Sequence, residues 1–279
     1  NSSQTKVYGA TDPTLAYTNS PALIGSDSFT GSLARAAGEN VGTTYAINQG
    51  TLTNSNYNIT FVPANFAITA KPLTISGLAA TSKTYDKSTT AALTGTPSLV
   101  GIVGSDDVTL DGTAVGTFNT KDYGTGKTVT VSGLSLTGAA AANYSLTPLT
   151  LTADINKVAL TVAGAVSVSK TYNGNTTATA NFGSATLTGV LAPETVGLVT
   201  TGYSATFDNK NVGTGKTVAI SGLTLDGADA GNYSLTQPSL TDGEITQAAI
   251  TVTANSSQTK VYGATDPTLT YTVTSGGLI

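Results

Sequence analysis

The chain contains no cysteine, histidine, methionine or tryptophan among its 279 residues. Cysteine and histidine are the usual zinc ligands, and they act as nucleophile and general base in most covalent catalysis. Their absence removes zinc sites of the usual kind, thiol nucleophiles and imidazole bases together. We therefore expect a protein that is not an enzyme and that binds no cofactor.

Charged residues are also scarce. They make up 10% of the chain, with 12 Lys and Arg against 16 Asp and Glu, for a formal net charge of −4. The basic residues are scattered singly, so the chain has no basic patch for a nucleic-acid backbone or an anionic membrane. No apolar run reaches the length of a membrane span. We expect neither nucleic acid nor membrane insertion.

Roughly a fifth of the chain is threonine, and 31 residues are glycine. The β-branched residues suit pleated, half-buried strands, and Gly, Asn and Asp supply the turns between them. No long stretch carries the charged face that a surface helix would need. The composition predicts an all-β fold of short strands joined by tight turns.

The sequence repeats itself. Residues 1–15 recur letter for letter at 255–269, which is the mark of a tandem array. One junction motif, an Ile followed after four residues by Leu or Ile, occurs three times. Its copies begin at Ile68, Ile155 and Ile245, which lie 87 and 90 residues apart. They predict four modules: residues 1–71, which lack a first strand, then 72–157, 158–247, and 248–279 as the truncated start of another.

Two landmarks recur inside the modules, and we treat them as structural motifs. A Lys-x-Tyr motif stands near each module start, and Asn-Tyr followed by x and an aliphatic residue stands near each module end. The residues concerned are Lys6 and Tyr8, Lys83 and Tyr85, Lys170 and Tyr172, and Lys260 and Tyr262 for the first motif, and Tyr57, Tyr144 and Tyr233 for the second.

A spacing near the end of the third module bears on the fold. Asp229-x-Gly231-x-Tyr233 has the spacing of the immunoglobulin E–F corner, where a tyrosine hydroxyl bonds back to the nearby backbone. With the strand count, this favours an Ig-like Greek-key β-sandwich for each module, and a row of such modules would form an elongated rod. The alternative is a β-grasp-like module with one short helix at residues 104–110 or 26–33.

The motifs carry a family resemblance across essentially the whole chain. KVYGATDPTLTYTV at 260–273 resembles the opening of MBG repeat domains, and KTYD at 83–86 and KTYNG at 170–174 resemble YDG repeat domains. Both belong to large bacterial surface adhesins, including filamentous-haemagglutinin-like proteins. The resemblance implies an extracellular location on the bacterial cell surface, a stalk architecture that projects a binding domain, and a role in adhesion or biofilm formation.

Other functional classes stay open at this point. A module could itself bind a carbohydrate or a host protein, so a glycan or host surface receptor joins the neighbouring modules as an expected partner. A hydrolase is a more distant alternative, because the only candidates are Asp pairs without a repeated Glu partner.

Three further patterns have a chemical and a structural interpretation. The Lys-x-Tyr lysines could form isopeptide crosslinks, but Glu occurs only at 39, 194 and 244 and offers no recurring buried acid, so we favour lysines that protect a strand edge. Asp106, Asp107 and Asp111 are weak calcium candidates that also suit turns. GTGK at 124–127 and 213–216 lacks phosphate-loop spacing, and we interpret it as a hairpin turn.

The ends of the chain predict a contact between molecules. ITVTA at 250–254 precedes the second copy of the echo and has no counterpart before Asn1. A first module without that strand should carry an open sheet edge, which invites strand addition. We expect a head-to-tail contact in which residues 250–254 of one molecule, or the strand beside them, fill the vacancy in another. The alternative is that residues 250–279 fold back on the third module as an extension of its last sheet.

Overall fold

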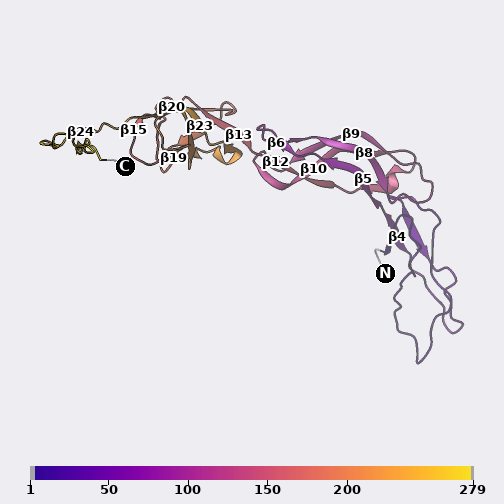
Figure 1. Ribbon diagram of the computed structural model, residues 1–279. Coiled ribbons are helices and arrows are strands. Elements are labelled where there is room, and N and C mark those ends of the chain that lie inside the picture. Colours follow the sequence, from indigo (N-terminus) through magenta and orange to yellow (C-terminus); the bar gives the residue numbers. More distant parts are fainter. Residues whose placement is uncertain (1–3, 278–279) are drawn as a thin grey trace. The chain divides into compact units, whose positions relative to one another are not determined.

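The computed structural model describes residues 4–277, which form an all-β protein (Figure 1). The described residues contain no α-helix, and two single 3-10 turns, η1 (Ala141–Asn143) and η2 (Ala230–Asn232), are their only helical elements. The all-β prediction is confirmed. The helix of the alternative fold is wrong at both proposed places, because residues 26–33 form no regular element of that kind and residues 104–110 are a turn that leads into a strand.

No helix among the described residues is long and apolar enough to span a membrane. The chain divides into two compact units. Unit 1 comprises Asn1–Lys83 and Lys87–Ile155, and unit 2 comprises Thr84–Asp86 and Asn156–Ile279. The short segment Thr84–Asp86 therefore packs with residues that follow it by more than seventy positions.

Unit 1 begins with a sheet in the order β1-β4-β3-β2, in which β1 is parallel to β4 and the other pairs are antiparallel. Its strands are β1 (Gln4–Val7), β2 (Ala34–Arg35), β3 (Thr44–Asn48) and β4 (Ala64–Thr69). Alternate residues of β3 and β4 point inward, as the pleat requires. Tyr45, Ile47, Phe66 and Ile68 form the resulting core and are at most 5% exposed.

The rest of unit 1 contributes two sheets, in the orders β6-β12-β10-β9-β7 and β11-β5-β8. The strands are β5 (Lys71–Ala80), β6 (Lys83–Thr84), β7 (Thr90–Ala91), β8 (Leu93–Val100), β9 (Thr109–Phe118), β10 (Gly124–Thr137), β11 (Tyr144–Leu146) and β12 (Leu149–Asn156). β11 runs parallel to β5, which is the first strand of this part of unit 1. Leu73, Val108 and Tyr144 form a buried cluster beside this pair.

Unit 2 repeats this order of elements in smaller sheets, β17-β13-β22, β14-β16, β15-β23-β20-β19, β18-β21 and β24-β25. Its strands are β13 (Val158–Ala163), β14 (Val166–Val168), β15 (Lys170–Thr171), β16 (Thr179–Asn181), β17 (Thr186–Thr188), β18 (Gly197–Val199), β19 (Ser204–Phe207), β20 (Gly213–Ser221), β21 (Thr224–Asp226), β22 (Tyr233–Leu235), β23 (Ser239–Thr246), β24 (Thr251–Ala254) and β25 (Tyr271–Ser275). The core centres on Phe207, Val218, Ile220 and Ile245.

The GTGK segments are not hairpin turns, contrary to our interpretation. They open the strands β10 and β20, and the pairing with the neighbouring strand shifts register within each segment, between Gly124 and Lys127 and between Gly213 and Lys216. Gly126 and Gly215 have φ of 58° and 65°, a left-handed conformation that glycine adopts without steric cost. The segments are β-bulges, and the chain reverses just before them.

Candidate functional site

The tyrosine of each Lys-x-Tyr motif is fixed at the end of a strand. The backbone N–H donates to a carbonyl at the end of the last strand of the same repeat, from Tyr8 to Thr69 at 2.9 Å, from Tyr85 to Asn156 at 2.8 Å, and from Tyr172 to Thr246 at 2.9 Å. The three tyrosines thus occupy one equivalent position, beside the point where the repeat's last strand finishes.

The tyrosine of each later Asn-Tyr motif begins a strand that directly follows a 3-10 turn. Tyr144 lies opposite Lys71 and Tyr233 lies opposite Val158, each in a parallel pair with the first strand of the same repeat. Tyr144 is 6% exposed and Tyr233 is 2% exposed. Each buried hydroxyl accepts a hydrogen bond from a loop N–H, that of Val103 at 2.9 Å and that of Leu191 at 3.1 Å.

The two kinds of tyrosine meet at a shared carboxylate. In unit 1 the hydroxyls of Tyr8 and Tyr144 both donate to Oδ2 of Asp106, at 2.8 and 2.6 Å. Their rings pack edge to face, with centroids 5.2 Å apart. We call this arrangement, an acid between one tyrosine of each motif, a Tyr–carboxylate–Tyr cluster.

Unit 2 contains the same cluster built from different sequence. Tyr233 donates to Oε2 of Glu194 at 2.5 Å, and Tyr85 donates to Oε1 of the same side chain. The rings again meet edge to face, with centroids 6.0 Å apart. The acid is an aspartate in one cluster and a glutamate in the other, so the geometry is kept although the acidic side chain differs in length.

The clusters shift the acidity of their own groups. Burial and the bond to Asp106 raise the pKa of Tyr144, and the bond to Asp106 followed by burial raises that of Tyr8. Burial and the bond to Glu194 raise the pKa of Tyr233 to about 12. The two hydroxyls lower the pKa of Asp106, because they stabilise its anion. An ionised acid held by two neutral donors is suited to fixing two segments together.

The hydroxyl of Tyr233 does not make the immunoglobulin corner bond that its spacing suggested. It bonds Leu191 and Glu194, about forty residues earlier in the chain, instead of nearby backbone. Asp229, the other residue of that spacing, accepts a hydrogen bond from the N–H of Thr195 at 3.1 Å. The corner interpretation is therefore wrong, because a carboxylate from a distant loop competes for the hydroxyl and forms the stronger, charge-assisted bond.

The calcium candidates are used in other ways. Asp106 accepts two tyrosine hydroxyls, and Asp107 accepts the N–H of Ala139 at 3.1 Å. Asp111 lies within β9, opposite Ser135 of β10. Between residues 4 and 277, no three His, Cys, Asp or Glu side chains gather in a way that could hold a metal ion.

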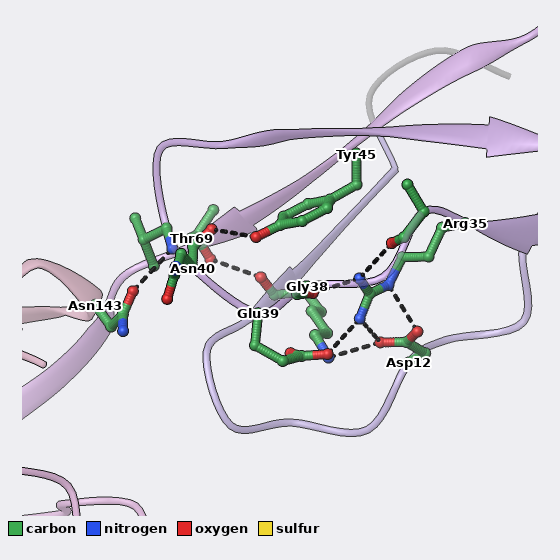
Figure 2. A network of polar contacts seen from close by, with 11 residues as sticks. Asp12, Arg35, Gly38, Glu39, Asn40, Tyr45, Thr69 and Asn143 are labelled. Atoms are coloured by element: carbon green, nitrogen blue, oxygen red, sulfur yellow. Dashed lines mark hydrogen bonds and ion pairs between the residues drawn. The ribbon is translucent and has the colours of Figure 1, made fainter.

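A second polar network joins Asp12, Arg35 and Glu39 beside the first sheet (Figure 2), and these acids also bond Lys6. Its Nζ lies 2.6 Å from Asp12 and 2.6 Å from Glu39. Arg35 bonds the same two acids, through Nε to Asp12 at 2.7 Å and through Nη2 to Glu39 at 2.5 Å. The side chains of Lys6 and Arg35 are 6% and 7% exposed, whereas both acids are about half exposed. Two buried cations are thus neutralised from the solvent side.

This four-charge network lowers the pKa of both acids. Bonds to Arg35 and then Lys6 lower the pKa of Asp12 to about 2, and the bond to Lys6 is the largest cause that lowers the pKa of Glu39. Arg35 also lies over the rings of Tyr45 and Phe66, at 5.2 and 5.3 Å from their centroids. The network therefore closes one end of the first core, with its cations buried against the core and its acids facing solvent.

The lysines of the YDG-type repeats have a related place with different partners. Lys83 lies 5.6 Å from the ring centroid of Phe118 and donates to Ser88 at 2.9 Å. Lys170 lies 5.5 Å from that of Phe207, and its Nζ bonds the side chains of two asparagines in the following turn. Their strands, β6 and β15, are edge strands, as is β1 with Lys6. Lys83 and Lys170 thus each cover a core aromatic ring at a sheet edge.

The echo at residues 255–271 reproduces local contacts only. Gln258 bonds Thr270 as Gln4 bonds Ala16, through both its amide atoms, and Lys260 pairs with Asp266 as Lys6 pairs with Asp12. The side chain of Lys260 is nevertheless 47% exposed, and Tyr262 is fully exposed. This loop forms from its own residues, whereas burial of its lysine and tyrosine needs the rest of a module.

Sequence reasoning named Asp106 only as a calcium candidate, and it missed the tyrosine-binding role of both acids and the role of Arg35. Asp106 and Glu194 each stand three residues after an aliphatic residue whose carbonyl accepts their N–H, Val103 at 3.1 Å and Leu191 at 3.0 Å. This aliphatic-x-x-acid turn, 38 or 39 residues before the Asn-Tyr tyrosine, is the only signal that could have found them. The two residues between the aliphatic residue and the acid differ completely, being Gly-Ser in one turn and Ala-Pro in the other.

Comparison with known families agrees with this repeated geometry. The YDG domain matches residues 69–151 and again 156–240, and the MBG domain of the YGX type matches residues 2–67. Comparison with curated proteins finds no match. The two YDG matches cover more than half of the chain, and each contains one complete Asn-Tyr strand and its acid. The chain therefore belongs to the YDG family. Its first part is an MBG domain, which supplies Tyr8 to the first cluster.

Proposed function

We propose that the chain is a structural stalk segment of a bacterial extracellular adhesin, in which modules in series hold a binding domain away from the cell surface. The Tyr–carboxylate–Tyr cluster is the observation that carries this proposal. In each copy, one tyrosine comes from one family match and the acid with the second tyrosine comes from the next match. Buried hydrogen bonds of this kind stiffen a junction that a flexible linker would leave free.

The proposal includes the shape of the modules and their place. Each family match is taken as one β-module of Ig-like type, and the modules follow one another as an elongated rod at the bacterial cell surface. Short connections support this, because Ile68 and Leu73, at most 3% exposed, lie on either side of only four residues. The same is true of Ile155 and Leu160. The proposal expects such short connections to limit bending between modules.

A binding module is the second candidate, and one observation favours it. The MBG domain contains a cavity of about 520 Å³ with Tyr17, Phe29 and Tyr57 on its walls, and aromatic rings are a usual platform for sugars and peptides. The chain provides no catalytic constellation that we can assign, so we propose a non-enzymatic role in either case.

A glycan and host-protein array with the full chain separates the two candidates. The stalk proposal expects no saturable binding of any glycan or protein on the array. Saturable binding of one ligand class that Tyr17→Ala abolishes would overturn the stalk proposal in favour of the binding module.

A further inference from the structure

The cavity of the MBG domain lies between two segments that belong to no sheet. Residues 16–23 form one wall, and residues 57–63 form another, just before β4 begins. The core side chains Leu33, Ile47 and Leu52 also line it. A space between two segments that belong to no sheet can accept a further strand.

Each YDG domain fills the corresponding place with its own first strand. β11 lies parallel to β5 with Leu146 opposite Leu73, and β22 lies parallel to β13 with Leu235 opposite Leu160. Leu73 and Leu160 are fully buried there. In the MBG domain the corresponding Asn-Tyr segment, residues 57–59, has no strand beside it within the part of the chain that the structure describes.

Residues 248–254 have the sequence of such a first strand. The junction 245–250 repeats the junction 68–73, which makes Ile250 the counterpart of Leu73. Ile250 is nevertheless 44% exposed, and all four residues of β24 are exposed. β24 pairs only with β25, with Ala254 opposite Tyr271. A lone two-stranded hairpin is at best marginally stable in water.

The walls of the cavity match both edges of β24. Tyr271 and Thr272, its partners in the hairpin, repeat Tyr17 and Thr18 of the first wall at a distance of 254 residues. The second wall offers Tyr57 and Ile59 in the positions that Tyr144 and Leu146 occupy beside β5. Strand 248–254 can therefore exchange β25 for the first wall and gain a parallel partner in the second.

The MBG domain also contains half of a Tyr–carboxylate–Tyr cluster. The hydroxyl of Tyr57 accepts the N–H of Ile24 at 2.8 Å, and the N–H of Asp27 donates to the carbonyl of Ile24 at 3.1 Å. This is the turn of Val103 and Asp106, with its acid in the same position. Within residues 4–277 the carboxylate of Asp27 has no hydrogen bond, and Asp27 is exposed.

Tyr172 is the matching half at the other end of the chain. Its backbone is fixed by Thr246 as that of Tyr8 is by Thr69, but its hydroxyl has no hydrogen-bond partner in the described part of the chain. Tyr172 borders a hollow with Val212, Ala248 and Ile250. Ile250 and Val212 are 44% and 48% exposed, so an apolar surface surrounds the tyrosine.

We propose that the end of one copy of this chain docks into the MBG domain of a second copy. Residues 248–254 occupy the cavity as an added strand, and the hydroxyl of Tyr172 donates to Asp27 beside Tyr57. The two surfaces lie on different parts of the chain, so the contact is heterologous and builds open head-to-tail chains of molecules. Because the partners are not tethered, association is weaker than within one chain and depends on concentration.

Analytical ultracentrifugation of the full chain tests the strand. We expect the average sedimentation coefficient to rise with concentration, and Ile250→Asp to abolish the rise, because it buries a charge in the cavity. Val261→Asp is the matched control, since Val261 is 77% exposed outside β24 and should not change association. Association that Ile250→Asp leaves unchanged, or no association at any concentration, would overturn the proposal.

A mixing experiment tests the head-to-tail geometry. Ile250→Asp blocks the donor end, and Leu23→Asp blocks the cavity wall without touching the core cluster. The two variants are expected to form a 1:1 complex that grows no further, while the double variant stays monomeric. A symmetric dimer of either single variant contradicts the proposed geometry.

A double-mutant cycle tests the tyrosine. Tyr172→Phe and Asp27→Asn should each weaken association about tenfold or more, the usual cost of a hydrogen bond to a charged group. Together they should cost little more than either alone, because they remove one bond. Tyr262→Phe and Asp111→Asn are controls with the same chemical change and should have no effect. Additive losses from Tyr172→Phe and Asp27→Asn would show that they do not meet.

Discussion

Tyr85 and Tyr233 meet edge to face in unit 2, with ring centroids 6.0 Å apart and an interplanar angle of 78°, and both hydroxyls donate to Glu194. Unit 1 makes the same contact between Tyr8 and Tyr144, at 5.2 Å and 74°, around Asp106. Two residue pairs with different acids arrive at one geometry, so the cluster is a property of the repeat.

Removing the buried hydroxyl should weaken unit 2 without altering its packing. Tyr233→Phe deletes the bond to Glu194 and leaves the N–H of Leu191 unpaired, which should cost about 2 kcal/mol of the free energy of unfolding. Urea unfolding followed by tyrosine fluorescence measures this cost. Tyr262→Phe, at a fully exposed position, is the control and should be neutral. Equal stability of Tyr233→Phe and the unchanged chain would contradict a stabilising cluster.

The same cluster should lose strength at high pH. Burial and the bond to Glu194 raise the pKa of Tyr233 from its ordinary value of 10.0 to about 12. A raised folded-state pKa means that the neutral hydroxyl stabilises the fold fully below pH 10, and that this contribution is lost as pH rises from 10 to about 12. Tyrosinate absorbance should show a late-titrating group that Tyr233→Phe removes. A titration curve identical in the variant would exclude this assignment.

The four-charge network makes the opposite prediction at low pH. Bonds to Arg35 and Lys6 lower the pKa of Asp12 to about 2 from an ordinary 3.8. A lowered folded-state pKa gives stability that is present above about pH 4 and is lost as pH falls to about 2. Carbon NMR of the carboxyl groups should find Asp12 titrating last, and Arg35→Gln should raise its pKa. An Asp12 that titrates near 4 would mean that the network is loose in solution.

Composition predicted the all-β fold, because strand-forming residues are a local property of the sequence. The division into four repeated stretches, read from the verbatim echo and the junctions, stays a prediction. The Tyr–carboxylate–Tyr cluster could not be predicted in this way. Glu194 and Asp106 acquire their role only when a loop 38 or 39 residues upstream folds against the Asn-Tyr strand, and their neighbours in sequence differ. Asp106 therefore resembled a calcium ligand, and Tyr233 resembled an immunoglobulin corner.

Arg35 shows a second limit. Its neighbours suggested neither a strand nor a site, yet it bonds Asp12 across 23 residues and lies over two core rings. Arg35 can be buried and paired with a solvent-exposed acid only because the loop between residues 8 and 33 brings Asp12 back to the sheet. Spacing alone does not carry that information.

The lysines should remain free of crosslinks. Lys170 is bonded to Oδ1 of Asn173 and of Asn175, both at 2.9 Å, but an isopeptide bond also needs a buried acid to move protons. Among the described residues, no Glu or Asp side chain bonds Lys170, whose Nζ donates to two asparagine side chains and to backbone carbonyls. We expect the intact mass to equal the sequence mass. Loss of one ammonia, mapped to Lys6, Lys83 or Lys170, would show that a crosslink forms.

The stalk proposal predicts an extended particle in solution. The junctions contain no Gly/Ser linker around which modules could fold back. In the proposal, the shared carboxylate of each cluster limits bending further. Small-angle scattering at low concentration should give a maximum dimension beyond about 100 Å, where a compact globule of this length would measure about half that. Glu194→Ala removes the acid of one cluster and should broaden the distribution of distances, whereas Glu244→Ala should not. A compact profile for the unchanged chain would contradict the stalk.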